Sequence, residues 1–584
     1  MATANPREFV PGRCMSIDEK SSIETSPTQA ASSDRPSSGS SITTKASSLE
    51  SYKPKPQLST LQLLVIHIGA ALTLFLATTD ATIVSTSLPT ISSELKASQN
   101  QYTWVGVSYM LTQTAFQPLY GRISDLVGRK TVLYCSIFVF ALGSALCGAA
   151  QSINWLITAR ALAGIGGGGI VSAVWVITTE IVEVRKRAAW SQALSITWSC
   201  SAIAGPLIGG LFSGTHGTTV SWRWAFYMNL PLCFVALVVL VTSLRHVEFK
   251  TASNASWLTL SRKFDFVGLA SFMGGTSCII IGFSFSTDLG WASPFTLTLL
   301  VLGTVVLISG AFYEKHTSRD PLFPATTFKD TTAVAVLVII FLHNFAFTAG
   351  TFYLALFFQA ANGSTPLQSG IKLLPYSLGS SLASMPAAWF IGYWQRRTHD
   401  TSGQNRTISL GLLISTVGFG LLNLLNEHAS IVPQMIYPLI AGIGIGMLFH
   451  APYQVFARTL KAEELATGTS AFFLVRFTGA TVGLSIAGTI FYAKSTGRLP
   501  PDLGVNNASA IDYSTIKLLP PAVKAEVLHV VSGSIRLIWT VCAPCLAVAF
   551  LISLGLQKLP NSDAEKVSET HTTPTQSSAE DEKV

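Results

Sequence analysis

Residues 61–84 read LQLLVIHIGAALTLFLATTDATIV, an apolar run in which Asp80 is the only acidic residue and no Lys or Arg occurs. Roughly 20 predominantly apolar residues are enough for an α-helix to cross a bilayer. Comparable runs recur as far as Leu556, and the chain of 584 residues is 49% hydrophobic but only 12% charged. Because soluble domains carry about 25% charged residues, the sequence predicts a polytopic membrane protein.

Fourteen such segments can be placed along the chain. Backbone groups that face lipid must be satisfied within their own segment, so we expect every segment to be an α-helix and the fold to be all-α. The expected spans are 61–83, 103–121, 131–150, 154–178, 190–213, 225–244, 266–286, 295–313, 332–358, 369–394, 407–425, 433–456, 467–492 and 534–556.

The two ends of the chain differ in composition from the spans. Residues 1–58 are rich in Ser, Thr and Pro, and residues 558–584 are polar and end in acidic residues. Such segments bury too little apolar area to fold alone, so both are expected to be disordered tails. Because no apolar stretch precedes residue 59, the first span is expected to act as an uncleaved insertion signal.

The net charge of +8 comes from bases clustered in short loops between the spans. Short basic loops mark the cytoplasmic face of a membrane, so both tails are expected to be cytoplasmic and no nucleic-acid partner is expected. The expected location is the plasma membrane, with the vacuolar membrane as the alternative. Sequons at Asn362 and Asn507 fall on the outer side and are candidate glycosylation sites.

The loop between the second and third spans reads GRISDLVGRK, residues 121–130. Gly121 and Gly128 permit a tight backbone, and Asp125 can cap a helix or pair with Arg129 and Lys130 at a helix end. Such a charged cluster is suited to hold one conformation and release another, as a gate requires. The alternative is an ordinary basic turn on the cytoplasmic face.

This loop resembles the loop signature of the major facilitator superfamily. Four further segments resemble motifs of its fourteen-span drug:proton antiporters: DATIV at 80–84, RALAGIG at 160–166, GPLIGG at 205–210 and WRWAFY at 222–227. The sequence departs from the pattern at 85–87, which read STS, and at 392–397, where GYWQRR is a degenerate second copy of the loop. The resemblance implies six-helix bundles at 59–245 and 331–557, with a central helix pair within 246–330.

Ionisable groups at membrane depth are costly and usually functional. Asp80 near the outer end of the first span could change protonation when buried, and it is the candidate proton-coupling acid; capping or pairing at the helix end is the alternative. By resemblance, Arg160 could tune this acid or hold a substrate; a structural hydrogen-bond anchor is the alternative. Glu180 is a weaker coupling candidate, since an interfacial ion pair with nearby bases explains it as well.

Three other ionisable residues, His343, Arg476 and Arg536, also lie in apolar spans and could face a cavity between helices. A single His in such a place is more often a satisfied core residue than a proton carrier. Aromatic residues of the ninth span, including Phe352 and Tyr353, could line an apolar cavity, although core packing is the commoner role.

Small residues in the spans predict close helix packing. By resemblance, Gly205, Pro206, Gly209 and Gly210 form the fifth-span antiporter motif, and Pro206 removes a helix hydrogen bond. Residues 164–169 match G-x-G-x-x-G, but the match lies inside an apolar span and not after a strand, so it predicts helix packing and no dinucleotide site.

The sequence contains no phosphate-binding loop, HExxH or Cys/His cluster, so no enzyme activity and no cofactor are expected. The predicted function is a proton-coupled antiporter that exports small hydrophobic or amphipathic compounds, such as drugs or toxins, as a monomer. By resemblance, the long polar tails are typical of fungal members. The alternatives are a proton symporter for iron chelates or other nutrients and a membrane receptor that binds a solute without transporting it.

Overall fold

The computed structural model describes residues 59–560, except for 183–186, 214–220, 246, 248, 250–261, 263, 318, 320–321, 324–326, 462–463, 496–497 and 499–518. The predictions for the tail 1–58, for most of the tail 558–584 and for Asn507 lie outside these residues. The described part is built from helices, and no β-strand occurs in it. The prediction of an all-α fold is confirmed.

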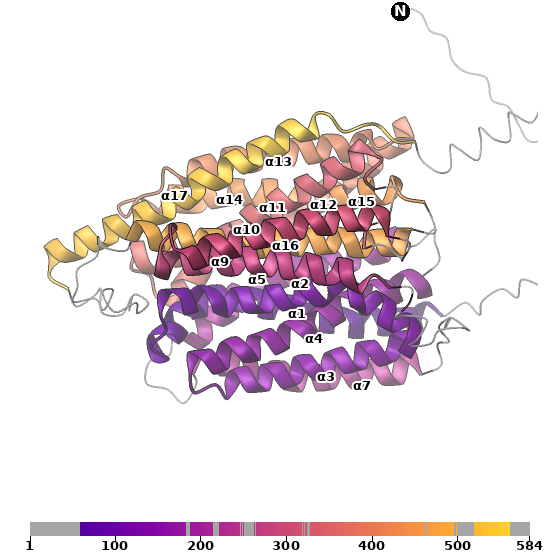
Figure 1. Cartoon of the computed structure of the whole chain (residues 1–584), viewed down its shortest axis with the longest axis horizontal. Helices are drawn as coiled ribbons and strands as arrows, with labels where there is room; N and C mark the ends of the chain where they lie inside the picture. Colours follow the sequence, from indigo (N-terminus) through magenta and orange to yellow (C-terminus); the bar gives the residue numbers. More distant parts are fainter. Residues whose placement is uncertain are drawn as a thin grey trace, which may run out of the picture. The chain divides into compact units, whose positions relative to one another are not determined.

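The N-terminal helices pack mainly with one another (Figure 1). They are α1 (Thr60–Glu94), α2 (Gln99–Val127), α3 (Arg129–Gly148), α4 (Ile153–Ile181), α5 (Arg187–Ser213), the single turn α6 (Trp224–Tyr227) and α7 (Asn229–Leu244). Helix α4 lies against both α2 and α3, and α1 lies against α5 and α7. Helices α1 and α2 therefore contact most of the other helices of this group between them.

The C-terminal helices follow the same plan. They are α11 (Thr331–Leu356) with the π-helical turn η2 (Phe357–Ala361), α12 (Pro366–Thr398), α13 (Ser402–Leu422), α14 (Ile431–Met447), α15 (Ala451–Arg458), α16 (Leu465–Ser495) and α17 (Pro521–Ser553). Helix α14 lies against α12 and α13, and α11 lies against α16 and α17. In Figure 1 these helices run roughly parallel or antiparallel to the N-terminal helices.

Helices α9 (Phe266–Leu289) and α10 (Pro294–His316) form an antiparallel pair between the two groups in sequence. Helix α9 contacts both α2 and α16. Trp104 Nε1 donates to Ser284 Oγ at 2.7 Å, and Thr489 Oγ1 donates to the carbonyl oxygen of Phe283 at 3.0 Å. The pair is therefore attached at a line where the N-terminal and C-terminal helices meet.

Twelve helical segments of the described chain are long and apolar enough to cross a membrane. Helices α2 and α12, with 29 and 33 residues, are as long but more polar. Both pack among the other helices, where the buried side chains Gln113 and Gln117 of α2 and Ser380 and Ser381 of α12 avoid lipid. With these two, the helices match the fourteen predicted spans.

Three predicted boundaries are wrong. Helix α1 continues to Glu94, so Asp80 lies within the helix and not near its end. The predicted span 433–456 is two helices. Helix α14 ends at Met447, and α15 begins at Ala451 with Pro452 in its first turn. The predicted loop 493–533 is too long, since α17 already begins at Pro521.

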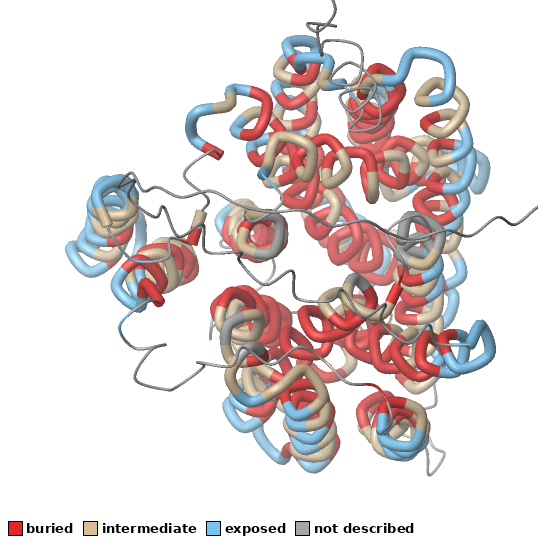
Figure 2. Tube along the Cα trace, turned by 90° about the vertical axis from the view of Figure 1, so that its right-hand side faces the viewer, coloured by how far each residue is buried: buried red, intermediate tan, exposed pale blue. Residues whose placement is uncertain are grey.

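Exposure is segregated between the faces of the helices. Figure 2 shows buried residues turned toward neighbouring helices and exposed residues on the outside. The outer face is apolar, as at Phe138, Phe234, Val301 and Leu382, whose exposed fractions exceed a third. An apolar exterior over polar interior contacts is the arrangement that a lipid environment favours.

The N-terminal and C-terminal helices meet along α5–α12 and α2–α16, with further contacts between α1 and α11. At the α5–α12 crossing, a Cβ on Gly210 would lie 2.5 Å from the carbonyl oxygen of Pro366. A Cβ on Gly370 would lie 2.7 Å from that of Pro206. Only glycine permits this approach of the two backbones.

Candidate functional site

Asp80 lies on α1 and is only 1% exposed. Its Oδ2 pairs with Arg160 Nη1 of α4, while its Oδ1 accepts a hydrogen bond from Asn229 Nδ2 of α7 at 3.1 Å. Arg160 Nη2 also donates to the backbone oxygen of Asp80 at 3.2 Å. The two predicted charged residues therefore form one buried ion pair.

The guanidinium of Arg160 is enclosed by α2 and by the turn α6. Its Nε donates to the carbonyl oxygen of Val105 at 3.4 Å. Its Cζ lies 4.3 Å from the ring centroid of Tyr109 and 5.7 Å from that of Phe226. Aromatic faces attract a cation, more so where water is excluded, so these rings favour the charged arginine.

Asn229 connects the ion pair to α3. Its Nδ2 also lies 3.1 Å from Ser144 Oγ of α3, and Tyr109 OH donates to the carbonyl oxygen of Ala77 at 2.8 Å, one turn before Asp80 on α1. The ion pair thus joins α1, α2, α3, α4 and α7. We define Asp80, Arg160, Asn229, Ser144 and Tyr109 as the buried charge network.

The sequence prediction found two members of this network and missed three. Asn229, Ser144 and Tyr109 carry no charge, so a search for ionisable groups at membrane depth does not select them. The available signal was an amide side chain inside an apolar span, since a buried amide requires polar partners.

Glu180 does not join the network. It lies 20 residues beyond Arg160 on α4, roughly 30 Å along the helix axis. There its Oε1 accepts from both Nε and Nη2 of Arg129, each at 2.8 Å. Glu180 is thus placed in an ion pair, and its partner among the described residues is Arg129. Of the bases that follow α4 in sequence, residues 185 and 186 and the side chain at 187 lie outside the described part.

The loop between α2 and α3 is a single glycine. Gly128 has φ of +92°, a region that side-chain-bearing residues rarely adopt. The turn brings Arg129 back to the end of α2, where its Nη1 donates to the carbonyl oxygen of Gly121 at 3.2 Å and to Ser124 Oγ. We name Arg129, Glu180, Gly121 and Ser124 the loop cluster.

Lys130 and Asp125 are the two other charged residues of the predicted gate. Lys130 Nζ donates to the carbonyl oxygen of Arg245 at 3.4 Å and lies 5.7 Å from the ring centroid of Phe249. The side chain of Asp125 lies outside the described part of the chain, so its role stays a prediction. Lys130 therefore ties the start of α3 to the end of α7.

The fifth-span motif lies where α5 crosses α1 and α12. A Cβ on Gly205 or Gly209 would overlap Thr82 Oγ1 or the carbonyl oxygen of Ile83 on α1. Thr86 Oγ1 of α1 donates to the carbonyl oxygen of Pro206 at 2.8 Å. Two faces of α5 are therefore in backbone-level contact, one with α1 and one, through Gly210, with α12.

The glycines at 164–169 pack α4 against α2 and α3, as the sequence predicts. A Cβ on Gly168 would lie 2.9 Å from the carbonyl oxygen of Gln113 on α2. Cβ atoms on Gly164 and Gly166 would overlap the backbone of Tyr109 and Phe140.

The candidates His343 and Arg536 both contact backbone carbonyl oxygens of other segments. His343 Nε2 lies 3.0 Å from the carbonyl oxygen of Ile445, and its Nδ1 lies 3.2 Å from Asn344 Nδ2, so both ring nitrogens have partners. Arg536 Nε donates to the carbonyl oxygen of Asn423 at 2.7 Å, which ties α17 to the end of α13. Both side chains thus have partners within the protein, and the expectation that they face a cavity stays a prediction.

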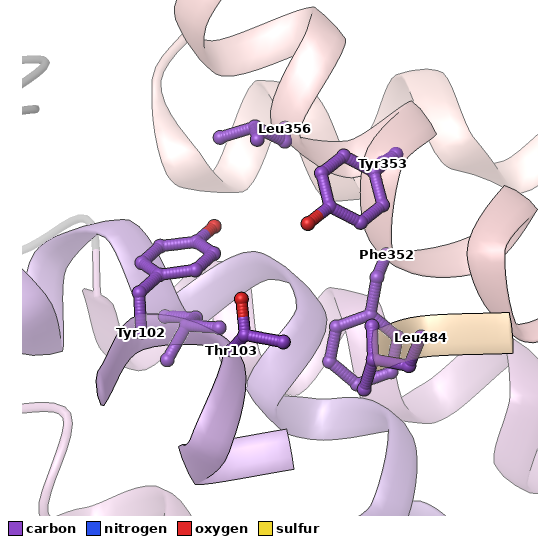
Figure 3. Close-up of a pocket in the computed structure, with 7 residues that line it drawn as sticks. Tyr102, Thr103, Phe352, Tyr353, Leu356 and Leu484 are labelled. Atoms are coloured by element: carbon purple, nitrogen blue, oxygen red, sulfur yellow. The ribbon is translucent and has the colours of Figure 1, made fainter. Parts of the chain in front are cut away.

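A small pocket lies between the N-terminal and C-terminal helices (Figure 3). Its lining residues are Leu88, Tyr102, Thr103, Phe352, Tyr353, Leu356 and Leu484. Phe352 and Tyr353 thus line a pocket, but its free space is roughly that of one water molecule. Since Gln359 Nε2 of η2 also donates to the carbonyl oxygen of Thr86 at 3.0 Å, this end of the interface is closed.

Asn362 follows η2 and is partly buried. Its side-chain oxygen accepts a hydrogen bond from Lys372 Nζ. Glycosylation at Asn362 stays a prediction. Among the described residues, no group of three or more His, Cys, Asp and Glu side chains could hold a metal ion.

Comparison with known proteins assigns the family. Residues 70–359 match the family model described as Major Facilitator Superfamily. An uncharacterised MFS-type transporter of Schizosaccharomyces pombe is 33% identical over 494 residues, which cover 84% of this chain and 81% of that protein. The efflux pump dotC of Dothistroma septosporum is 30% identical over 452 residues, which cover 77% and 74%.

Solved structures agree on the fold. A POT family peptide transporter superposes with a TM-score of 0.58 at 13% identity, covering 86% of this chain and 98% of its own. A bacterial homologue of the lysosomal transporter Spinster, in an inward-facing conformation, gives 0.56 at 15% identity, covering 85% and 97%. The chain is therefore a multi-pass membrane transporter, and not an enzyme, that belongs to the major facilitator superfamily.

Proposed function

We propose that this transporter is a proton-coupled antiporter that exports small hydrophobic or amphipathic organic compounds. The observation that carries the proposal is the ion pair between Asp80 and Arg160, whose side chains are 0% and 1% exposed. Relatives named efflux pumps, such as dotC of Dothistroma septosporum and FUS6 of Gibberella fujikuroi, support the direction of transport.

The chemistry of the pair suits coupling. Burying two charges is tolerated while they neutralise each other, but removing one leaves an uncompensated charge that is strongly unfavourable. A proton that binds Asp80 leaves Arg160 without its counter-charge, and the hydrogen bond from Asn229 is weakened. Because Asp80 is on α1 and Arg160 on α4, a change in protonation alters the preferred arrangement of these helices.

The loop cluster supplies a second element. Arg129 joins the end of α2, the start of α3 and the end of α4, and a Cβ on Gly121 would lie 3.7 Å from Ser470 Oγ of α16. The loop cluster therefore lies beside α16 of the C-terminal helices. An ion pair at such an edge can stabilise one of two arrangements of the N-terminal and C-terminal helices. We propose that it stabilises the state closed at this end.

We also propose the wider setting that the sequence predicts. Bundles at 59–245 and 331–557 rock about a cavity at mid-depth, with the pair at 246–330 attached to them. The transporter acts as a monomer in the plasma membrane with both termini in the cytoplasm, because the basic loops lie on that side.

The decisive experiment uses purified protein in sealed vesicles loaded with rhodamine 6G. An antiporter moves the dye against its gradient when a pH difference is imposed, and a protonophore stops the movement. Vesicles without protein are the control. Dye movement that is equally fast with and without a pH difference would contradict the proposal, and binding of the dye without any movement would favour a receptor.

A first prediction concerns the α5–α12 crossing. Gly210→Leu is expected to reduce transport at least about tenfold, because a side chain there overlaps the backbone at Pro366 and prevents the close approach of the two helices. Gly420→Leu on α13 is the matched control, since a Cβ there meets nothing within 4 Å. Dye export per molecule of protein in the membrane measures both; equal rates would exclude a role for this crossing.

A second prediction concerns the loop cluster. Glu180→Gln is expected to slow transport severalfold, because Arg129 loses its charged partner and the closed state is less stable. The exchanged pair Arg129→Glu with Glu180→Arg is expected to recover part of the rate. The same assay compares the wild type, both single variants and the exchange. An exchange no faster than the slower single variant would show that the pairing is unimportant.

A further inference from the structure

Arg476 is a second buried cation, and it lies between the two groups of helices. It projects from α16 of the C-terminal group and is 5% exposed. Its Cζ lies 4.2 Å from the ring centroid of Trp198, which belongs to α5 of the N-terminal group, and 5.8 Å from that of Phe449. Arg476 therefore faces across the interface, near the middle of both α16 and α5.

Arg476 differs from Arg160 and Arg129 in its partners. Among the described residues its sole hydrogen bond runs from Nε to Asn344 Oδ1 at 3.3 Å, and none of the described carboxylates forms an ion pair with it. A guanidinium has five N–H donors, and a buried charge is normally paired. The described surroundings of Arg476 thus provide cation–π contacts but no counter-charge.

The neighbouring side chains offer further donors and apolar walls. The indole Nε1 atoms of Trp198 and of Trp175 on α4 are buried without a hydrogen-bond partner. Phe473 lies between them, with ring centroids 6.4 Å from Trp198 and 5.8 Å from Trp175. Both indoles are partly exposed as whole side chains. Apolar walls with a few convergent donors are typical of small-molecule sites.

We propose that Arg476 and Trp198 bind the anionic group of the transported compound, so that the substrates are carboxylic acids with an aromatic or apolar body. This inference rests on the proposed export function and specifies its substrate class. The guanidinium fork matches a carboxylate with two parallel hydrogen bonds, and the indole N–H supplies a third. Because the two residues come from opposite groups of helices, the fit of the acid depends on how those groups are arranged.

The test measures binding and not transport. Full-length protein in lipid nanodiscs is titrated calorimetrically with naphthalene-1-acetate and with naphthalene-1-acetamide, which share one aromatic body and differ in charge. The wild type is expected to bind the acid at least about tenfold more tightly, because charge-assisted hydrogen bonds are roughly twice as strong as neutral ones. Arg476→Gln is expected to bind both compounds equally.

Two variants distinguish the site from a structural role. Arg476→Lys keeps the charge without the fork and should retain part of the preference for the acid. Trp198→Phe keeps a ring beside Arg476 but lacks the N–H, and should weaken binding of the acid more than that of the amide. Arg397→Gln is the matched control, since Arg397 stacks on Tyr393 at 4.5 Å but is exposed. If Arg476→Gln does not fold, these two variants decide.

The inference is overturned if the wild type binds neither compound, binds both equally, or if Arg476→Gln keeps the preference. Proton-driven export of rhodamine 6G with no preference for acids would refute this inference and leave the proposed function intact. A preference for acids lost in Arg476→Gln, without proton-dependent export, would support the site and refute the antiport.

Discussion

Asp80→Asn is expected to reduce pH-driven export to the level of vesicles without protein, while the protein still folds. Asparagine keeps one oxygen that can accept from Arg160, and its NH2 group can donate to Asn229 once the amide of Asn229 is turned over. It cannot take up or release a proton in this range of pH. Movement of dye down its own gradient should persist and should no longer respond to pH. Vesicle assays with and without a pH difference measure both rates.

The matched control is Asp330→Asn. Asp330 caps α11 by accepting a hydrogen bond from the backbone of Thr332 at 2.7 Å, and asparagine caps helices about as well. This variant should transport like the wild type. Export by Asp80→Asn that still follows the pH difference would remove Asp80 from the mechanism.

Arg160→Gln is expected to be the most destabilising of the substitutions proposed. It leaves the carboxylate of Asp80 buried without its counter-charge, and breaking a buried pair in this way costs about 3–5 kcal/mol. The double variant with Asp80→Asn removes both charges and should regain most of the stability but none of the coupling. Thermal unfolding of the purified proteins measures the order of stability.

The order itself is the test. We expect the wild type to unfold at the highest temperature and the double variant below it. Asp80→Asn, which leaves Arg160 buried without its counter-charge, should follow, and Arg160→Gln should unfold lowest. A double variant no more stable than Arg160→Gln would show that the two residues act independently, since coupling between contacting residues appears as non-additivity.

The fold could be predicted because apolar runs and basic loops are local features of a sequence. The positions that failed depend on other physics. The stretch after Pro521 contains Lys524, Glu526 and His529 and so resembles a loop by charge, but a proline in the first turn starts a helix there. The predicted first span ends at residue 83 because polar residues follow. In the structure α1 continues, since these polar side chains bond back to α1 itself, as Ser87 Oγ does to the carbonyl oxygen of Ile83.

The candidate site could be predicted only in part, because partners distant in sequence are chosen by packing. Asp80 and Arg160 are conspicuous as charges in apolar spans, yet nothing in the sequence indicates that they pair with each other. Glu180 has bases close by in sequence, but α3 brings Arg129 to it from 51 positions away. Arg476 is equally hard to distinguish from Arg536 in the sequence, because only the packed helices show which partners each arginine has.

The position of the α9–α10 pair also determines where the interface between the N-terminal and C-terminal helices is shielded from lipid. Helix α9 covers the junction of α2 and α16 and is bonded to both of them. Sideways access from lipid is therefore covered along that junction. At the junction of α5 and α12 the two helices touch directly, with Gly210 against Pro366. There Ser381 Oγ of α12 donates to the carbonyl oxygen of Ser199 of α5 at 2.9 Å. The two junctions are thus closed in different ways, one by a third helix and the other by direct contact of the backbones.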